Sequence, residues 1–379
     1  LVLCLFSLVA VFFSFLWARR IAGERAGLAA AVAAAVWFEL VYFAPKAFTE
    51  VLAAHLLLPG LYFACFAAGR RPEWFRAGVW LGLALALRIH LAPAVGFATI
   101  YLCRRRWRDR WLPLAAGLLL PLLLFGLVDA FTWSYPFQSL WKNLWVNLVL
   151  AKSEQFGVAP WYRYATLLLG IWTWAAVPVL FLAAIGARRI PLLAWVAVII
   201  VASHSAIGHK EYRFLYPILP LVCTLAGVGL AELAELAGSR WRRAALVLLL
   251  FAWTLTSALL AVRAAPLWEK YGGNLRAFSE LSHTDSLCGV ALANLTWSEA
   301  PGYTYLHRDV PIFLIERPQD VETRASQFNF VLTPRDKPLW PQGFDALWCW
   351  RGACLLRRPG GCQPAPGYHI NRVLEERGQ

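Results

Sequence analysis

The chain has 379 residues, of which 60% are apolar and only 15% are charged, and its mean hydropathy is +0.55. This composition excludes an ordinary soluble globular protein and indicates a polytopic membrane protein. The net charge of +14 would suit a nucleic-acid-binding protein. However, residues 1–262 carry 23 Lys and Arg against 10 Asp and Glu, and residues 263–379 carry 13 against 12. Because the excess lies between apolar runs, we attribute it to membrane topology and expect no nucleic-acid partner.

The apolar runs are long enough to cross a bilayer as helices. The first, residues 1–18, has no basic leader and no small-residue cleavage site, and the sequence contains no Met. We interpret it as a spanning helix entered partway, and expect a further segment upstream of Leu1. The other expected spans are residues 27–44, 51–68, 112–131, 165–186, 190–207, 214–237 and 244–262.

Basic clusters between these runs set the expected orientation, because Lys and Arg near spanning helices favour the cytoplasmic side. The clusters are residues 19–25, 70–76, 104–110, 188–189 and 240–243. Residues 77–102 keep both flanks on that side only if two short helices turn back near Arg88-Ile89-His90. Arg88 and His90 would then reach a polar pocket or the outer half of the membrane. The alternative is one long tilted helix with Arg88 snorkelling.

The loop of residues 132–163 would lie on the opposite, outer side. Leu140, Leu144, Trp145 and Leu148 recur in it at helical spacing, which predicts an amphipathic helix at the membrane interface. Asn143 and Asn147 share one face of this helix, where they could meet sugar hydroxyls.

The composition changes near Arg263, where Gly, Pro and charged residues become more frequent. We therefore divide the chain into a membrane domain, residues 1–262, and a small α/β domain outside the membrane, residues 263–379. Short strand-like runs support the second domain. They are residues 289–293, 310–315, 328–333 and 346–350, with 353–356 facing the last across a turn.

Four cysteines, Cys288, Cys349, Cys354 and Cys362, fall in this second domain. Disulfides are favoured over zinc because no His supplies a ligand spacing, and the three possible pairings stay open. We find no nucleotide-binding or metal-binding motif in the chain, and predict no metal and no cofactor.

The densest group of ionisable residues is His209, Lys210, Glu211 and Arg213, followed by Pro217 and Pro220. At a membrane boundary such charges must be stabilised by water, by each other or by a ligand. Interface anchoring explains the group as well as a binding site does. The residues by themselves leave both interpretations open.

The same group resembles the hallmark of glycosyltransferase family 22, which comprises the lipid-phosphate-mannose-dependent alpha-mannosyltransferases of N-glycan and GPI-anchor assembly and their bacterial relatives. The matching residues are His209-Lys210-Glu211-x-Arg213-Phe214-x-x-Pro217-x-x-Pro220-Leu221. Phe156-Gly157-x-x-Pro160-Trp161-x-x-Tyr164 resembles a second family segment. The stretch from Asp129 through Trp133 and Asn143 to Asn147 resembles the one before it. Lys46 and Glu50 are a weaker match.

The resemblance implies a GT-C-like bundle of about ten helices. It also implies an inverting mannosyltransferase that uses a polyprenyl-phosphate sugar donor and a glycan or glycolipid acceptor in the lipid bilayer. Under this hypothesis His209, Lys210, Arg213 and Arg88 bind the donor phosphate, with Arg as the planar bidentate partner. Glu211 would orient these cations.

Supporting contacts are expected from Asn147, Trp161 and Tyr164, with a place in the interfacial aromatic belt as the alternative for the two aromatic residues. The family's principal acid lies in its first outer loop, which we expect upstream of Leu1. The catalytic base is therefore unassigned. Asp129 and Glu50 are the fallback candidates, and each could equally be a helix cap or a structural partner.

Two other functions remain as alternatives, a polyprenyl-linked glycan transporter or flippase and a non-catalytic homologue. A transporter would more often show an internal repeat and charges spread through the membrane midplane. The abundance of Ala, Leu, Arg and Trp suits a GC-rich bacterial genome. We therefore expect a bacterial inner membrane with the site facing the periplasm, or the endoplasmic reticulum membrane if the source is eukaryotic.

Overall fold

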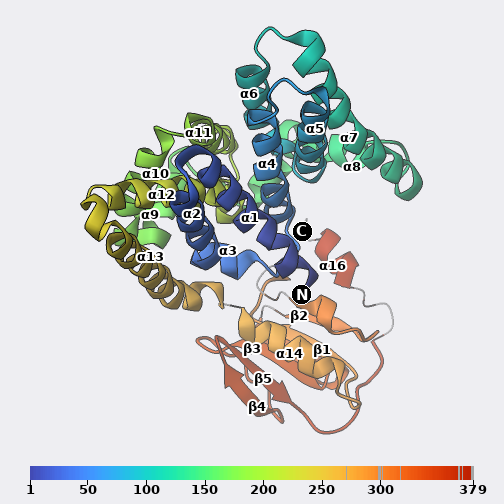
Figure 1. The fold of residues 1–379 in the computed structure, drawn as a ribbon. Coiled ribbons are helices and arrows are strands. Elements are labelled where there is room, and N and C mark those ends of the chain that lie inside the picture. Colours follow the sequence, from blue (N-terminus) through green and yellow to red (C-terminus); the bar gives the residue numbers. More distant parts are fainter. Residues whose placement is uncertain are drawn as a thin grey trace. The chain divides into compact units, whose positions relative to one another are not determined.

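The structure is a computed structural model that describes residues 1–269, 271–297, 300, 302–315, 317–365, 368 and 370–376. It divides into two compact units, Leu1–Ala261 and Val262–Gln379. The first is helical, and the second contains a five-stranded sheet (Figure 1). The predicted fold class, a helical membrane bundle with a small C-terminal α/β part, is confirmed.

The helices of the first unit follow the apolar runs. They are α1 (Val2–Ala22), α2 (Glu24–Val36), α3 (Phe38–Phe43), α4 (Thr49–Cys65), α5 (Arg71–Leu87), α6 (Ala92–Cys103), α7 (Leu112–Thr132), α8 (Gln138–Leu144), α9 (Arg163–Trp172), α10 (Ala176–Ala187), α11 (Pro191–Ser205), α12 (Ile218–Glu235) and α13 (Gly238–Trp268). Among the described residues, five stretches are long and apolar enough to cross a membrane. They are Val2–Ala22, Trp107–Thr132, Arg163–Ala187, Ile218–Glu235 and Gly238–Trp268.

Two predicted spans are interrupted. The run of residues 27–44 forms α2 and α3, separated at Trp37, whose backbone is extended (φ −63°, ψ 120°). This break places the Trp37 indole N–H 2.7 Å from the Glu39 carboxylate. The run of residues 165–186 is likewise divided into α9 and α10 by a short 3₁₀ turn at Thr173–Ala175.

Residues 77–102 turn back on themselves. α5 ends at Leu87, Arg88 leaves helical geometry (φ −145°, ψ 86°), and α6 begins at Ala92. Both flanks of the hairpin meet at its base, because the Arg71 guanidinium lies 3.0 Å from the Asp109 carboxylate. The predicted pair of short helices is confirmed, and the alternative of one long tilted helix is wrong.

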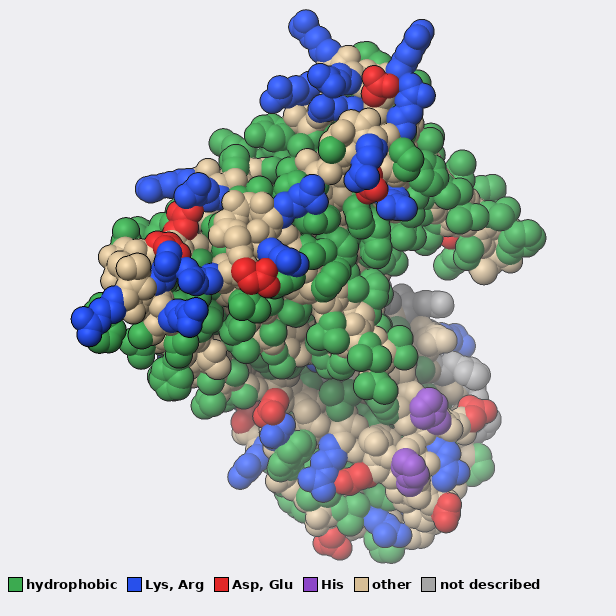
Figure 2. Space-filling view, in the orientation of Figure 1, with side chains coloured by type: hydrophobic (Ala, Val, Ile, Leu, Met, Phe, Trp, Pro, Cys, Tyr) green, Lys and Arg blue, Asp and Glu red, His purple; other side chains and the backbone are tan. Residues whose placement is uncertain are grey.

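Contacts join all five basic clusters at one end of the helical unit. Arg20 lies over the Phe66 ring at 4.7 Å, which connects the first cluster to the base of the hairpin. Near the C-terminus of α12, Glu232 pairs with Arg189, and Glu235 pairs with Arg25 and Arg242. Figure 2 shows Lys and Arg side chains gathered along this end.

Helices in this unit approach closely where glycines leave room. A Cβ on Gly117 of α7 would lie 2.1 Å from the Phe75 carbonyl oxygen of α5, and one on Gly227 of α12 would lie 2.2 Å from the Cα of Ala30 in α2. Such small-residue contacts are a common way for membrane helices to gain dispersion energy. α12 is the central helix, since most of its residues are buried.

These contacts predict a stability difference between two helical glycines. Gly117→Ala should lower the free energy of unfolding by about 1–3 kcal/mol, because the new methyl group must displace the α5 backbone. Gly96→Ala meets nothing within 4 Å and should be neutral or stabilising, since Ala is the better helix former. Thermal unfolding of both variants in detergent checks this, and equal unfolding temperatures would contradict it.

The second unit is organised around the sheet β2-β1-β3-β5-β4. Its strands are β1 (Val290–Ala293), β2 (Ile312–Ile315), β3 (Phe330–Pro334), β4 (Asp345–Trp350) and β5 (Ala353–Arg357). β1 pairs in parallel with β2 and β3, and β5 runs antiparallel to β3 and β4. α14 (Gly272–Ser282) covers one face through Phe278, and α15 (Pro318–Arg324) covers the other through Val321.

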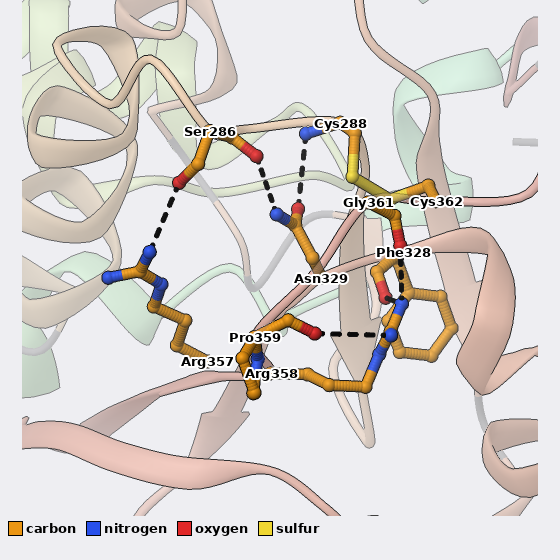
Figure 3. The surroundings of a disulfide bond; sticks show 9 residues. All are labelled: Ser286, Cys288, Phe328, Asn329, Arg357, Arg358, Pro359, Gly361 and Cys362. Carbon is orange, nitrogen blue, oxygen red and sulfur yellow. Dashed lines mark hydrogen bonds between the residues drawn. A yellow bond between two sulfur atoms is a disulfide. The ribbon is translucent and has the colours of Figure 1, made fainter.

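The four cysteines of this unit form the disulfides Cys288–Cys362 and Cys349–Cys354. Figure 3 shows how the first is fixed: the Asn329 amide accepts from the Cys288 N–H at 3.1 Å and donates to the Ser286 carbonyl at 2.6 Å. On the Cys362 side of the disulfide, Arg358 donates to the carbonyl of the preceding residue, Gly361, at 3.0 Å. The disulfide therefore ties the segment after β5 to the entry of β1.

Candidate active site

The charged group of residues 209–213 lies in the connection between α11 and α12. A 3₁₀ turn at Tyr212–Leu215 leads into Pro217, which precedes the first residue of α12. Proline suits this position because its fixed φ starts a helix and its missing N–H is not needed there. The central helix therefore begins directly behind the charged residues, which fixes their place relative to the bundle.

Two guanidinium groups converge on one buried carboxylate. Glu50, in the first turn of α4, lies 3.1 Å from the Arg88 guanidinium and 3.9 Å from that of Arg213. The Arg213 Nε lies 2.7 Å from Glu211. Both guanidinium groups also contact the Phe214 ring, at 4.6 Å for Arg88 and 5.7 Å for Arg213. The break between α5 and α6 thus brings Arg88 to the 209–213 group.

His209 and Lys210 hold a neighbouring loop. The His209 ring lies between two acceptors, the Gly157 carbonyl at 3.1 Å and the Glu211 carboxylate at 3.2 Å, so a ring carrying both protons donates to each. Lys210 donates to the carbonyls of Ala159 and Ile207, at 2.9 and 2.5 Å. Residues 156–164 and 209–221, which resemble two different segments of the family, are therefore in direct contact.

A cavity of about 210 Å³ opens beside this network. Its lining carries one guanidinium, three imidazoles, two amides and a carboxylate, contributed by Arg88, His90, His204, His209, Asn143, Asn147 and Glu211. An adjoining cavity of about 200 Å³ shares Arg88, His90 and Asn143. Hydrogen-bonding groups and one cation, the Arg88 guanidinium, thus border a space of the size that a sugar or a phosphate occupies, a common arrangement in small-molecule sites.

Among the described residues, no group of three or more His, Cys, Asp or Glu is arranged to hold a metal ion. The Arg88 guanidinium lines the cavity and is available to balance an anionic ligand. A phosphate would meet guanidinium and imidazole N–H groups, which suit its oxygen atoms.

The family profile described as the Alg9-like mannosyltransferase family matches residues 1–307. The chain belongs to this family. It is 26% identical over 187 residues to GPI mannosyltransferase 3 of Candida glabrata, 34% over 192 residues to GPI alpha-1,2-mannosyltransferase 3 of Mus musculus, and 37% over 108 residues to alpha-1,2-mannosyltransferase ALG9 of Saccharomyces cerevisiae. These matches cover 46%, 47% and 25% of this chain. They cover only 29%, 33% and 18% of the relatives, so the chain spans about a third or less of their length.

Solved structures share the fold. ArnT from Cupriavidus metallidurans bound to undecaprenyl phosphate superposes with a TM-score of 0.61 at 12% identity, covering 95% of this chain and 84% of that one. The apo form of the same protein gives 0.60 at 13% identity, with 93% and 82% covered. The Alg9-like chain therefore has the GT-C fold that was expected from the resemblance.

The remaining predicted site residues lie in different environments. Asn147 lines the larger cavity, while Trp161 is 74% exposed and Tyr164 is buried. Asp129 is buried, and its carboxylate accepts from the backbone N–H and the hydroxyl of Ser139, at 2.8 and 2.7 Å. Asp129 therefore holds the first turn of α8, which carries Asn143 and leads into the π-helical turn Trp145–Val149 that carries Asn147.

Glu39 is a site-supporting residue that the sequence analysis missed. Its carboxylate is fully buried and accepts from the indoles of Trp37 and Trp172, at 2.7 and 2.8 Å, and from the Tyr212 hydroxyl. Tyr212 lies within the charged group, so Glu39 anchors this loop to α3 and α9. An acid inside an apolar run was the available signal, because such residues are seldom kept without a partner.

His204, near the C-terminus of α11, also belongs to the candidate site. Nδ1 lies 2.8 Å from the Ile200 carbonyl, which fixes the proton on that nitrogen. Nε2 is buried and has no hydrogen-bond partner among the described residues, and the ring lines the larger cavity. His204 thus offers an acceptor to a ligand hydroxyl.

Removing Glu39 should destabilise the chain more than removing one of its donors. Glu39→Ala leaves two indole N–H groups and one hydroxyl buried without an acceptor, and each such group costs about 1–3 kcal/mol. Tyr212→Phe removes a single donor and leaves the carboxylate with two. We expect thermal unfolding in detergent to place Glu39→Ala well below Tyr212→Phe. An unfolding temperature for Glu39→Ala at or above that of Tyr212→Phe would show that the carboxylate is not the anchor.

Glu211 predicts a pH effect on stability. Burial alone would raise the pKa of its carboxyl, but hydrogen bonds from His209 and Arg213 outweigh it and leave the pKa below the usual 4.5. Because this pKa is lower in the folded than in the unfolded chain, the stabilisation is complete above about pH 4.5 and is lost as the pH falls through the folded value.

Glu211→Gln should remove this contribution. Its unfolding temperature should lie below that of the unsubstituted chain above about pH 5. The gap should close as the pH falls through the folded pKa, since the Glu211 carboxyl is then as uncharged as the amide that replaces it. Thermal unfolding across a pH series measures the difference. A gap that stays constant with pH would show that ionisation of Glu211 is not its source.

Proposed function

We propose that this Alg9-like chain transfers mannose from a polyprenyl-phosphate donor to a glycan or glycolipid acceptor. The observation that carries the proposal is the paired guanidinium arrangement of Arg88 and Arg213 around Glu50, beside a cavity lined by imidazole and amide groups. The relatives named above as mannosyltransferases, and the ArnT structure with undecaprenyl phosphate bound, support both the sugar and the kind of donor.

The leaving group is the part of the reaction that these residues serve best. As the acceptor hydroxyl attacks the anomeric carbon from the opposite face, the bond from that carbon to the phosphate oxygen breaks with inversion, and the hydroxyl proton passes to water. Negative charge then accumulates on the lipid phosphate. Fixed cations aimed at this position stabilise the transition state more than the ground state. We assign Arg88 and Arg213 to this role. We propose that His209, whose ring nitrogens face the Gly157 carbonyl and the Glu211 carboxylate, positions the loop beside them.

The sugar would lie on the amide side of the cavity. Asn143 and Asn147 offer both donors and acceptors, and His204 offers an unpartnered acceptor nitrogen. Lys210 has its ammonium committed to two backbone carbonyls. We therefore propose that Lys210 holds the loop that shapes the cavity, instead of binding phosphate directly.

Neither fallback acid suits the role of proton acceptor. Glu50 has its carboxylate between two guanidinium groups, and Asp129 is bonded to Ser139. We propose that Glu50 positions the two arginines and that Asp129 positions α8. Glu211, paired with Arg213 and His209, orients these cations.

The site lies at the end of the helical unit opposite the basic clusters. α4 carries Glu50 in its first turn and ends at Cys65, about 22 Å away along the helix axis. The next residue, Phe66, is the one whose ring Arg20 of the first basic cluster covers. The positive-inside rule would then put the site on the non-cytoplasmic face. We propose a bacterial inner membrane with the site facing the periplasm.

The proposal is tested by charge-neutralising substitution at Arg213, whose partial exposure should let the variant fold. Arg213→Gln should reduce mannosyl transfer from mannosyl-phosphoryl polyprenol by about 100-fold or more, mainly in kcat, because a transition-state contact is lost. Arg213→Lys should recover part of this loss, since it restores the charge without the planar fork. The assay uses detergent-solubilised chain and radiolabelled donor.

Arg163→Gln is the matched control, because it removes the same charge from an exposed position of α9 outside the cavity. It should leave transfer unchanged. Full transfer by Arg213→Gln would overturn the proposal. Transbilayer movement of the lipid-linked sugar without any transfer would instead favour a flippase.

A further inference from the structure

The base of the α5–α6 hairpin carries more positive charge than its own acids balance. Arg70, Arg71 and Arg76 have partners in Glu73 and Asp109. By contrast, the segment that joins α6 to α7 holds four exposed arginines whose side chains form no ion pair among the described residues. These are Arg104, Arg105, Arg106 and Arg108. Topology requires positive charge here, but it does not require so many unpaired cations in one turn.

An apolar groove of about 420 Å³ lies between the helices that this segment connects. α6 lines it from Ala92 to Ile100, about 12 Å along the axis, and α7 lines it from Leu114 to Leu119. Thr99 is its one polar side chain apart from the indole of Trp111, and the Thr99 hydroxyl donates to the Val95 carbonyl at 2.8 Å. The wall therefore offers hydrocarbon with no free hydroxyl.

Trp111 connects the groove to the arginines. It lines the groove, and its indole N–H donates to the Arg104 carbonyl at 2.8 Å. Its ring stacks on Trp107, which is largely exposed, with centroids 5.0 Å apart. Tryptophan prefers the boundary between hydrocarbon and headgroups. One end of the groove is thus placed where a lipid headgroup lies, beside four free cations.

We propose that this groove binds an acyl chain of an anionic phospholipid, with the phosphate held by the unpaired arginines of residues 104–108. Charge complementarity identifies the occupant. The apolar groove is long enough to contact an acyl chain, and the arginines attract a headgroup with a net negative charge more strongly than a zwitterionic one. This lipid site is separate from the site proposed for catalysis.

The groove is not a continuation of the candidate active site. It shares no lining residue with either cavity there. Arg88 lies in the sequence between Leu85 and Ala92, which line the other end of the groove, and its guanidinium is paired with Glu50 at 3.1 Å. The donor's polyprenyl chain would find its phosphate partners at the active site, whereas the groove opens toward the arginine-bearing segment. This favours a phospholipid over the donor chain.

The test measures binding of dioleoylphosphatidylglycerol to the detergent-solubilised full chain by native mass spectrometry, with dioleoylphosphatidylcholine as the comparison. The unsubstituted chain should prefer phosphatidylglycerol by at least about tenfold, since each nearby arginine contributes about fivefold to anionic-lipid affinity. The triple variant Arg105→Gln/Arg106→Gln/Arg108→Gln should lose most of this preference. The matched triple Arg240→Gln/Arg242→Gln/Arg243→Gln removes equal charge elsewhere and should keep it.

The groove is tested separately with Gly96→Leu. A Cβ at Gly96 meets nothing within 4 Å and Gly96 lines the groove, so leucine should extend into the groove without disturbing the fold. It should weaken phosphatidylglycerol binding about tenfold and leave undecaprenyl phosphate binding unchanged. Gly170→Leu, on open space in α9, is the control and should affect neither lipid.

Three results would overturn the proposal. Phosphatidylcholine binding as tightly as phosphatidylglycerol would remove the role of charge. Unchanged phosphatidylglycerol binding in either Gly96→Leu or the 105–108 triple would remove the site. Weaker undecaprenyl phosphate binding in Gly96→Leu, with phosphatidylglycerol unaffected, would assign the groove to the donor chain. Unfolding temperatures of all variants confirm that each comparison is made on folded protein.

Discussion

The site depends on the pairing of the buried Glu50 carboxylate with two guanidinium groups. Arg88 at the break between α5 and α6 and Arg213 before α12 would repel each other so close together in a medium of low polarity. The carboxylate lies 3.1 and 3.9 Å from the two guanidinium groups and so offsets their repulsion. A buried charge needs such compensation. The arrangement leaves guanidinium edges available to a ligand that brings its own negative charge.

A second set of contacts fixes the position of residues 209–213 relative to the helices. Glu39 holds Tyr212, and His209 and Lys210 hold the loop around Gly157. Each of these contacts joins a charged or polar side chain to an irregular stretch of backbone. At membrane depth such backbone is tolerated only where protein or a water-filled cavity surrounds it. The same contacts therefore satisfy the polar groups and shape the cavity.

Local features were predictable and distant pairings were not. Hydropathy located the helices, short strand-like runs located all five strands, and the five basic clusters required the α5–α6 hairpin. Each of these signals depends on residues that are neighbours in the sequence. The break at Trp37 and the partner of Arg88 depend on side chains far along the chain, namely Trp172 of α9 and Glu50 of α4. Disulfide pairing was equally out of reach, since four thiols allow three arrangements.

The sequence separation of these contacts sets an order of assembly. Glu50 meets Arg88 once the first five helices are made, whereas Glu39 meets Tyr212 only 173 residues later. During synthesis the early helices would thus enter the membrane with the first pair complete and with Glu39 served by Trp37 alone. Long-range closure is slow relative to local helix formation. The cavity therefore forms late, after the segment before α12 has been synthesised and its contact with Glu39 connects it to α3 and α9.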